Sequence, residues 1–363
     1  NVMSIRLEQN YRSTMSILNL ANAIIRNNRR RHSKDLWSDL GEGERPQLFA
    51  YNDENEEANR TAELVMKLHS EGDSFNQMAV LYRTNAQSRV FEYAFMQNKI
   101  PHSIVGSLHF YQRKEIKDLL GYLSSISNTA DSESLLRVIN EPPRGIGQTT
   151  VNRLLTFAAK ARIPLYQAVQ NVQAVEDLQN ASRKRVADFA QKLATWREMS
   201  LRAPVLDVVK AILDDLDLIP QYRRSGDPKD ISRAENLTEF VSSVSEFSER
   251  WVTEHESPAL LAGFLPFVAL QTDMDRVEEG AESVRLMTLH NAKGLEFDCV
   301  FIAGLEEELL PHRMSMDSRE SIEEERRLFY VGVTRAKTRL LLSYAQCRRI
   351  YASFRFTRPS LFL

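Results

Sequence analysis

The sequence predicts an α/β fold that is interrupted by a long helical block and then resumed. Strand-like and helical segments alternate over roughly the first hundred residues. From Lys114 to about Leu270 only helical periodicity is found, and strand-like runs return from Val284 onward. An α/β region divided in this way is the pattern of one domain inserted into another.

The first α/β region supplies three helices and three strands. We expect helices at 13–28, 54–70 and 87–97, and strands at 47–51, 78–82 and 102–105. The strands are short apolar runs rich in aromatic and branched side chains, whereas the helices have apolar residues three or four positions apart.

Prolines and glycines punctuate the helical block. The breaks fall at Pro142-Pro143, Gly145-Ile-Gly147, Pro204 and Gly226-Asp-Pro228. The later strands are expected at 284–288, 299–303 and 339–344. Cys299 then lies in a strand, and Cys347 lies where a strand leads into a helix.

Composition sets the class of protein. The 363 residues are 43% hydrophobic, which is enough for a sizeable core and two domains. No apolar run approaches the roughly 20 residues of a membrane helix, no signal peptide is visible, and the two cysteines form no CxxC pair. We expect a cytoplasmic protein without membrane contact. The net charge of −2 means that any nucleic-acid contact is local.

Two segments suggest a site that handles phosphate. Val284-Arg-Leu-Met-Thr-Leu-His-Asn-Ala-Lys-Gly-Leu-Glu-Phe297 is a β-favouring stretch that turns into a polar loop with His290 and Glu296. Glu323-Glu-Glu-Arg-Arg-Leu-Phe-Tyr-Val-Gly-Val-Thr-Arg-Ala-Lys337 is a carboxylate-rich helix that ends in an arginine. Arginine binds phosphate through two N–H groups and stabilises charge on a transferring phosphoryl group.

Together with Leu7-Glu-Gln-Asn-Tyr-Arg-Ser-Thr14, these segments resemble motifs IV, V and VI of superfamily 1 DNA helicases of the UvrD, Rep and PcrA family, closest to its UvrD/PcrA branch. Further matches are Leu81-Tyr-Arg-Thr-Asn-Ala-Gln-Ser-Arg89, Arg113-Lys-Glu-Ile-Lys-Asp118 and Ser232-Arg-Ala-Glu-Asn-Leu237. The resemblance runs nearly end to end. It implies the carboxyl-terminal half of such a helicase, with a RecA-like parallel-sheet motor domain 2A at 1–111 and 278–363 and an inserted all-helical domain 2B at 112–277.

The resemblance also implies half of an ATP site. Arg12 and Arg335 would contact the γ-phosphate, Tyr11 would stack on the adenine, and Glu296 would accept a hydrogen bond from the ribose. Packing in the core is the alternative for Tyr11, and helix capping or ion pairing is the alternative for Glu296. No GxxxxGK[ST] string occurs, so ATP and Mg²⁺ would be bound mainly by a first motor domain that the chain lacks. We expect this fragment not to hydrolyse ATP alone.

Glu323, Glu324 and Glu325 could suggest a metal site. They share one predicted helix with Arg326 and Arg327, at the spacing of helical ion pairs. We therefore expect ion pairs and no metal.

Residues for single-stranded DNA follow two of the predicted strands. The resemblance assigns Arg83, Asn85 and Ser88 to this strand, with helix capping as the alternative for Asn85 and Ser88. Thr288 and His290 would touch the same strand. His290 lies six residues before Glu296, so a short segment would couple DNA to the nucleotide.

A glycine-containing turn in the helical block is assigned by resemblance to duplex DNA ahead of the fork. Arg144, Gly145, Ile146 and Gly147 open a helix there, and their backbone N–H groups could approach phosphate. The alternative is an ordinary helix-start turn.

Two functions remain open. The first is the motor half of an ATP-dependent 3′-to-5′ DNA helicase of repair or replication. Its partners would be single-stranded and junction DNA, the missing amino-terminal motor domains and repair proteins. The second is a non-catalytic DNA-binding or regulatory module on the same fold, which the missing phosphate-binding loop favours for the chain as it stands.

Overall fold

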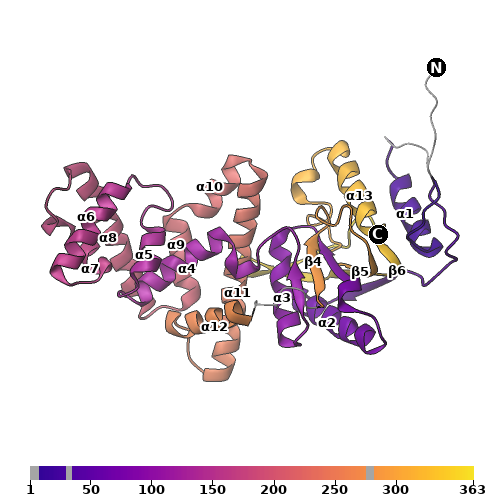
Figure 1. Cartoon of the computed structure of the whole chain (residues 1–363), viewed down its shortest axis with the longest axis horizontal. Helices are drawn as coiled ribbons and strands as arrows, with labels where there is room; N and C mark the ends of the chain where they lie inside the picture. Colours follow the sequence, from indigo (N-terminus) through magenta and orange to yellow (C-terminus); the bar gives the residue numbers. More distant parts are fainter. Residues whose placement is uncertain (1–7, 30–34, 275–281) are drawn as a thin grey trace, which may run out of the picture. The chain divides into compact units, whose positions relative to one another are not determined.

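The computed structural model describes residues 8–29, 35–274 and 282–363. Leu7 of the first motif and the start of the later motor segment at 278 lie outside the described residues. The chain divides into two compact units (Figure 1). Asn1–Phe110 and Met274–Leu363 form one, here called the sheet unit, and Tyr111–Asp273 form the other, here called the helical unit.

The sheet unit is built on a parallel sheet. Its strands are β1 (Gln47–Tyr51), β2 (Met78–Tyr82), β3 (His102–Ile104), β4 (Val284–Thr288), β5 (Phe297–Ile302) and β6 (Ala336–Ala345). The order is β1-β6-β5-β2-β4-β3, and every neighbouring pair is parallel. Because β4 lies between β2 and β3, the segments before and after the helical unit interleave in one sheet.

Helices cover both faces of this sheet, so its strands are buried and apolar on both sides. In β2, Ala79 and Leu81 pack with α1 (Met15–Arg26) and α13 (Arg319–Val333). The alternate residues of β2 pack with α2 (Glu54–Ser70) and α3 (Ser88–Gln97) on the opposite face. The two cores differ because successive side chains of a strand point to opposite sides.

The predicted helices and strands of this unit agree with the structure to within about three residues. The exception is the end of the chain. Cys347 opens a strand, β7 (Cys347–Ile350), which pairs antiparallel with β8 (Ser353–Phe356), so the expected helix is wrong. The turn uses Tyr351 and Ala352 at φ 52° and 62°, where glycine or asparagine is usual, so the sequence carried no hairpin signal.

The helical unit contains only helices among its described residues. They are α4 (Lys114–Ser127), α5 (Ser132–Val138), α6 (Gln148–Ala161), α7 (Leu165–Gln170), α8 (Asn180–Ser200), α9 (Val205–Asp215), α10 (Leu218–Ser225), α11 (Pro228–His255) and α12 (Leu261–Met274). Short 3-10 turns occur in both units, at Phe75–Gln77, Asn85–Gln87 (η2), Phe110–Gln112, Val172–Ala174 and Arg313–Ser315.

Aromatic packing and buried hydrogen bonds of Asn236 are among the contacts that hold the helical unit together. The Tyr122 ring meets Trp196 edge-on at 5.6 Å between centroids. Asn236 accepts a hydrogen bond from Arg113 at 2.8 Å and donates one to Glu115 at 2.5 Å. Two motif-like stretches of the sequence, one on α4 and one on α11, therefore meet to fix these helices.

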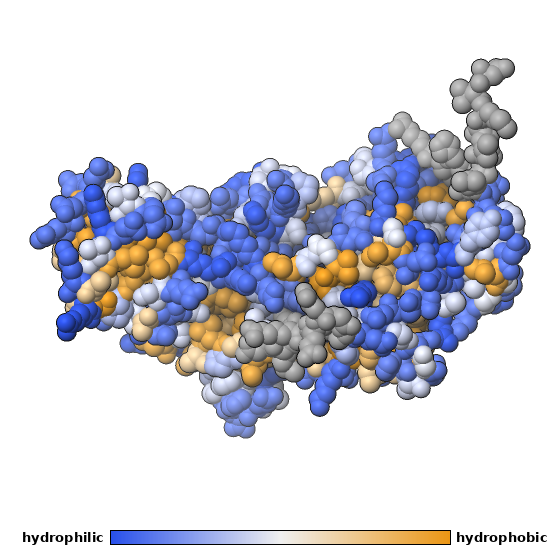
Figure 2. All heavy atoms as spheres, in the orientation of Figure 1, coloured by the Kyte–Doolittle hydropathy of each residue, from blue (hydrophilic) through white to orange (hydrophobic). Residues whose placement is uncertain are grey.

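The visible surface is mostly hydrophilic and is interrupted by separate apolar patches (Figure 2). Among the described residues, no helix combines the length and the apolar character needed to cross a membrane.

Candidate functional site

The predicted site residues of the sheet unit lie in two clusters at opposite edges of the parallel sheet. Tyr11, Arg12, Glu296 and Arg335 gather where β5 and β6 begin; we call this the amino-edge cluster. The loops that follow β2 and β4 form a second group at the other edge, with Arg83, Asn85, His290 and Glu325; we call this the carboxyl-edge cluster.

Backbone and Asn10 contacts build the amino-edge cluster. The side-chain oxygen of Asn10 accepts hydrogen bonds from the N–H groups of Arg12 and Ser13, each at 2.8 Å, which closes the turn before α1. The Ser13 hydroxyl donates to the carbonyl of Ala336 at 2.6 Å. These contacts attach the turn that bears Tyr11 and Arg12 to the first residues of β6.

Both arginines of this cluster are held in place. Arg12 donates from Nε to Glu296 at 2.6 Å and from Nη1 to the carbonyl of Thr334 at 3.2 Å. Arg335 donates from Nε to the carbonyl of Val331 and from Nη1 to that of Leu295, each at 3.0 Å. A guanidinium has five N–H donors, so each arginine retains N–H groups beyond these contacts.

The electrostatics of the cluster favour an anion. Partial burial, followed by the positive charge of Arg12, lowers the pKa of Arg335. The pKa of Glu296 is lowered chiefly by its hydrogen bond from Arg12, with Lys337 adding to the effect. Glu296 stays ionised and forms an ion pair with Arg12 at 2.6 Å, and its expected contact with the ribose stays a prediction.

Tyr11 is 80% exposed, so the alternative of a packed core tyrosine does not apply. Its hydroxyl donates to the side-chain oxygen of Gln9 at 2.8 Å, and Gln9 donates in turn to Asp39 at 2.8 Å. The ring is therefore oriented by its polar end while its faces remain open, as stacking on a flat base requires.

In the carboxyl-edge cluster Arg83 is bound by a carboxylate that the sequence did not indicate as its partner. Its Nε donates to Glu325 at 2.9 Å and its Nη2 donates to the other oxygen at 2.7 Å. Although burial by itself would raise the pKa of Glu325, the contacts with Arg83 and the N–H of His312 lower it. No signal in the sequence joins residues 242 positions apart.

Other expected DNA contacts in this region are partly used inside the protein. The side-chain oxygen of Gln87 accepts the N–H groups of Arg83 at 3.0 Å and Thr84 at 2.9 Å, so those two donors are occupied. Ser88 is fully buried and donates its hydroxyl to Glu92 at 2.5 Å. Asn85, at the start of η2, is half-buried.

The loop after β4 brings His290 to the surface but not Thr288. Thr288 is buried, and its hydroxyl accepts the N–H of Asn291 at 3.3 Å. Asn291 donates its amide to the carbonyl of Val105 at 3.0 Å, which braces the loop. The pKa of His290 is lowered by partial desolvation and then by Arg83, so the imidazole is neutral near pH 7.

Two segments connect the clusters. The stretch 289–296 leaves β4 at the carboxyl edge and enters β5 at the amino edge, so His290 and Glu296 mark its two ends. Helix α13 carries Glu325 beside Arg83 and ends just before Arg335. Ten residues of helix span about 15 Å, comparable to the length of these strands.

In the helical unit the Arg144 side chain turns inward. Its Nη1 donates to the carbonyls of Val138 and Ile139 at 2.7 and 2.9 Å, and its guanidinium lies 4.5 Å from the centre of the Phe189 ring. Ile146 is also buried. These contacts stabilise the end of α5 and leave neither side chain directed to solvent.

Gly145 and Gly147, on the same turn, are exposed. The side chain of Asn140 shapes this turn by accepting the N–H groups of Arg144 and Ile146, each at 3.0 Å. Gly145 has φ +72°, and Gly147 forms the start of α6. The turn therefore presents backbone, not side chains, at its surface.

The carboxylates at the start of the second motif form ion pairs. Glu323 lies 3.5 Å from Arg319 and 3.7 Å from Arg327, and Glu324 lies 2.7 Å from Arg327. Within the described part of the chain no group of histidine, cysteine or carboxylate residues could hold a metal ion.

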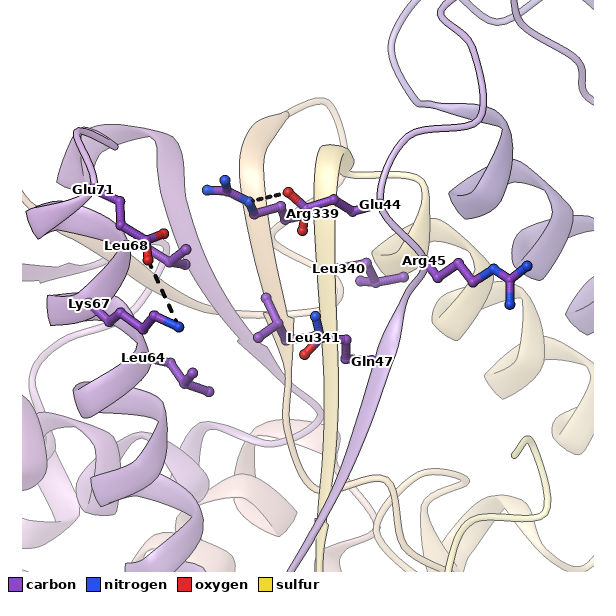
Figure 3. Close-up of a pocket in the computed structure, with 10 residues that line it drawn as sticks. All are labelled: Glu44, Arg45, Gln47, Leu64, Lys67, Leu68, Glu71, Arg339, Leu340 and Leu341. Carbon is purple, nitrogen blue, oxygen red and sulfur yellow. Dashed lines mark hydrogen bonds and ion pairs between the residues drawn. The ribbon is translucent and has the colours of Figure 1, made fainter.

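A cavity of about 210 Å³ lies between α2 and the strands β1 and β6 (Figure 3). Four of the charged side chains that line it form two ion pairs: Arg339 with Glu44 at 2.9 Å, and Lys67 with Glu71 at 3.9 Å. None of the predicted site residues lines this cavity.

Comparison with known proteins supports a single family. The family described as the UvrD-like helicase C-terminal domain matches residues 5–347. An ATP-dependent DNA helicase PcrA of Leuconostoc citreum is 37% identical over 365 residues, which cover 100% of this chain and 49% of that protein. DNA helicase II of Escherichia coli is 38% identical over 360 residues, 99% of this chain and 50% of that protein. The PcrA protein of Bacillus subtilis is 37% identical over 370 residues, 100% of this chain and 49% of that protein. The chain thus spans about half the length of these relatives.

Proposed function

Because the chain belongs to the UvrD-like helicase C-terminal domain family, we propose that it is the carboxyl-terminal motor half of an ATP-dependent DNA helicase. The helicase moves 3′ to 5′ on single-stranded DNA and unwinds duplex during repair or replication. The sheet unit serves as motor domain 2A, and the helical unit serves as the inserted domain 2B.

One observation carries this proposal: the amino-edge cluster and the carboxyl-edge cluster lie at opposite edges of the sheet, and two segments connect them. The amino-edge cluster has two arginines suited to phosphate, and the carboxyl-edge cluster has polar and basic groups suited to a nucleic-acid strand. The segment 289–296 and helix α13 each touch both. A displacement at one edge can therefore be transmitted to the other by elements that are already packed against the sheet.

The amino-edge residues fit an ATP phosphate. Arg12 and Lys337 both pair with Glu296, at 2.6 and 3.5 Å, while the hydrogen bonds of Arg335 go to backbone carbonyls and the Thr334 hydroxyl. Arg12 and Arg335 would hold the γ-phosphate, Glu296 would fix Arg12, and Tyr11 would cover the adenine. Bound ATP with Mg²⁺ supplies the phosphoryl group whose transfer powers the motor.

The carboxyl-edge residues would follow the single strand. His290 and Asn85 offer side-chain N–H groups to phosphate or base, and Arg83 adds positive charge while Glu325 fixes its orientation. Gly145 and Gly147 of the helical unit would place backbone N–H groups against duplex phosphates. The chain alone cannot complete an ATP site because its sequence has no phosphate-binding loop.

The proposal is tested by strand binding. Fluorescence anisotropy of a labelled oligothymidine should show that the chain binds single-stranded DNA, and His290→Glu and Asn85→Glu should each weaken that binding because they place negative charge at the carboxyl edge. Leu201→Glu, which adds the same charge at a 63% exposed position of the helical unit, is the matched control. Equal binding by both edge variants and the unmodified chain would contradict the proposed DNA path.

A second test concerns the motor. The chain fused behind the amino-terminal half of the Bacillus subtilis relative should regain DNA-stimulated ATP hydrolysis, and Arg335→Ala should abolish it. If the fused protein binds single-stranded DNA but never hydrolyses ATP, the non-catalytic DNA-binding module becomes the better description of the chain.

A further inference from the structure

The edge strand β1 lacks the features that usually protect the edge of a sheet. The strand order places β1 at one edge of the parallel sheet and β3 at the other. Edge strands of soluble proteins are usually very short, charged or interrupted by proline, because an open edge pairs readily with another chain. β3 is three residues long. β1 has five residues, and none of them is proline or charged.

The register shows which backbone groups of β1 face outward. Along a strand, the N–H and C=O groups of successive residues point alternately to its two sides. The carbonyl of Tyr51 accepts the N–H of Gln346, just beyond β6, at 2.8 Å, so Tyr51 faces β6. The backbone groups of Leu48 and Ala50 therefore point away from β6. Within residues 8–29, 35–274 and 282–363, no hydrogen bond from outside the sheet reaches either residue.

A cavity lies on each face of the sheet beside this open edge. The cavity of about 210 Å³ that Figure 3 shows is on the face covered by α2; we call it the α2-side cavity. A second cavity, of about 550 Å³, is on the face covered by α1 and α13, and Leu20, Leu48 and Leu342 contribute to its lining. We call it the α1-side cavity. A strand added beside β1 would direct alternate side chains toward these two cavities.

The α1-side cavity suits an apolar side chain. Leu342 and Phe362 in its lining belong to the core cluster of that face, and Leu20 packs against the same cluster. Leu48 is 51% exposed. An apolar side chain placed in this cavity would remove the Leu48 side chain from water and would itself be desolvated, which favours binding.

Arg45 gives the open edge a preference for negative charge. It lies just before β1 and contributes to the lining of both cavities. Figure 3 shows its side chain directed away from Lys67 and Glu71. The charged pairs of the α2-side cavity do not include it, and in the part of the chain that the structure describes Arg45 forms no ion pair. A carboxylate brought to the start of β1 would therefore meet a cation that has no partner.

We propose that β1 binds an extended segment of a partner protein by strand addition. Main-chain hydrogen bonds to Leu48 and Ala50 hold the segment, large apolar side chains enter the α1-side cavity, and a carboxylate pairs with Arg45. The interaction goes beyond the proposed function, because none of the residues assigned to nucleotide or DNA lies on β1.

A second copy of the chain fits this edge less well. The β1 strand that it would add contains no acidic residue for Arg45. Asp53, which follows shortly after, already caps α2 by accepting the N–H groups of Asn55 and Glu56. The charge of Arg45 thus favours a different, acidic segment.

The test uses two synthetic peptides that differ only in charge. The acidic probe is fluorescein-labelled Glu-Leu-Ser-Leu-Ser-Leu-Glu, which has a carboxylate at each end and so serves either strand direction; the basic probe has lysine in place of both glutamates. Fluorescence anisotropy with the full chain should show saturable binding of the acidic probe. The basic probe should bind roughly 5-fold more weakly or worse, because its charge repels Arg45.

Two variants separate the backbone contact from the charge. Leu48→Pro removes an outward N–H but leaves the β1–β6 bonds possible, since proline is tolerated where an edge N–H faces solvent. It should weaken binding of the acidic probe roughly 5-fold, the scale of one lost hydrogen bond. Arg45→Glu should reverse the preference and favour the basic probe. Arg224→Glu, at a 65% exposed arginine of the helical unit, is the matched control. Circular dichroism checks that each variant is folded.

The outcomes are distinguishable. No saturable binding of the acidic probe, or binding that neither Leu48→Pro nor Arg45→Glu changes, overturns the proposal. Self-association of the chain that Leu48→Pro abolishes assigns the edge to a second copy. Loss of probe binding when the chain is fused behind the amino-terminal half of the Bacillus subtilis relative assigns the edge to a contact within the longer protein. Either assignment also overturns the proposal, and all of these results leave the tests of DNA binding and ATP hydrolysis unaffected.

Discussion

Arg83 and Glu325 form a two-point ion pair between the loop after β2 and helix α13, with N–O distances of 2.9 and 2.7 Å. The Arg83 side chain is 18% exposed and that of Glu325 is 7% exposed, so water screens the pair only weakly. Helix α13 ends just before Arg335, a residue of the amino-edge cluster. The Arg83–Glu325 pair therefore attaches the carboxyl-edge cluster to a helix that ends at the amino-edge cluster.

The first prediction concerns that pair. Glu325→Ala should lower the free energy of unfolding by about 2 kcal/mol, because a mostly buried guanidinium loses its partner. Glu324→Ala on the same helix should change it by less than about 0.5 kcal/mol, since that side chain is 73% exposed. Urea unfolding followed by circular dichroism measures both. Equal effects of the two substitutions would mean that the pair contributes no more than a surface contact.

The second prediction concerns Arg335. In the fused, active protein, Arg335→Ala should reduce ATP turnover by about 10³-fold while nucleotide binding changes little. Arg335→Lys should restore little activity, because a single ammonium cannot reproduce three differently directed N–H contacts. Steady-state phosphate release gives the comparison, and near-normal turnover of the alanine variant would assign Arg335 a structural role.

The third prediction is that the chain alone does not hydrolyse ATP. The sequence contains no phosphate-binding loop for the β- and γ-phosphates, and it therefore also lacks the Ser or Thr of that loop that binds Mg²⁺. Phosphate release should stay at the buffer rate with and without single-stranded DNA. DNA-stimulated turnover by the purified chain would show that the amino-edge cluster is more than half of a site.

The fourth prediction concerns the turn before α6. Gly145→Ala should destabilise the helical unit, because Gly145 has φ +72° and the new Cβ would lie 2.8 Å from the Arg185 guanidinium. Gly147→Ala should be tolerated, since its φ is −79° and a Cβ added there would meet no atom within 4 Å. Thermal melting distinguishes the two.

Gly147 also permits a clean test of duplex contact. Gly147→Glu should weaken binding to a duplex with a single-stranded tail and leave binding to single-stranded DNA unchanged, with Gly147→Ala as the folded control. Unchanged affinity of the glutamate variant for the tailed duplex, across a salt series, would reduce this turn to an ordinary helix start.

The fifth prediction follows from the lowered pKa of His290, which partial desolvation and Arg83 cause. A nearby phosphate would raise that pKa, so strand binding takes up a proton and affinity should increase as pH falls from about 8 to about 6. His290→Gln should remove this increment. The free energy of unfolding depends on pH in the opposite direction. Because the pKa of His290 is lower in the folded chain than in the unfolded chain, this residue makes the fold less stable as pH falls below about 6.5. Folding must therefore be checked at the acidic end of the pH series.

The sequence by itself determined the family of the chain and, except for the β7–β8 hairpin, the helices and strands of the sheet unit. Periodicity, turn residues and motif spacing are local properties, and a strand such as β2 that is buried on both faces has a continuous apolar pattern. The same local patterns placed Arg12, Glu296 and Arg335 within motifs, and the parallel sheet then brought them together where β5 and β6 begin.

Only the tertiary structure decided which of the candidate residues reach the surface. Arg83 pairs with Glu325, which lies 242 residues further along the chain. The hydroxyl of Ser88 donates to Glu92, and that of Thr288 accepts the N–H of Asn291, so both hydroxyls point into the protein. Each of these contacts depends on how the packed fold places its side chains, and a buried polar group takes whichever partner that fold provides. The β7–β8 hairpin was missed for the converse reason: every residue of β8 is exposed, so the strand has no alternating apolar pattern to detect.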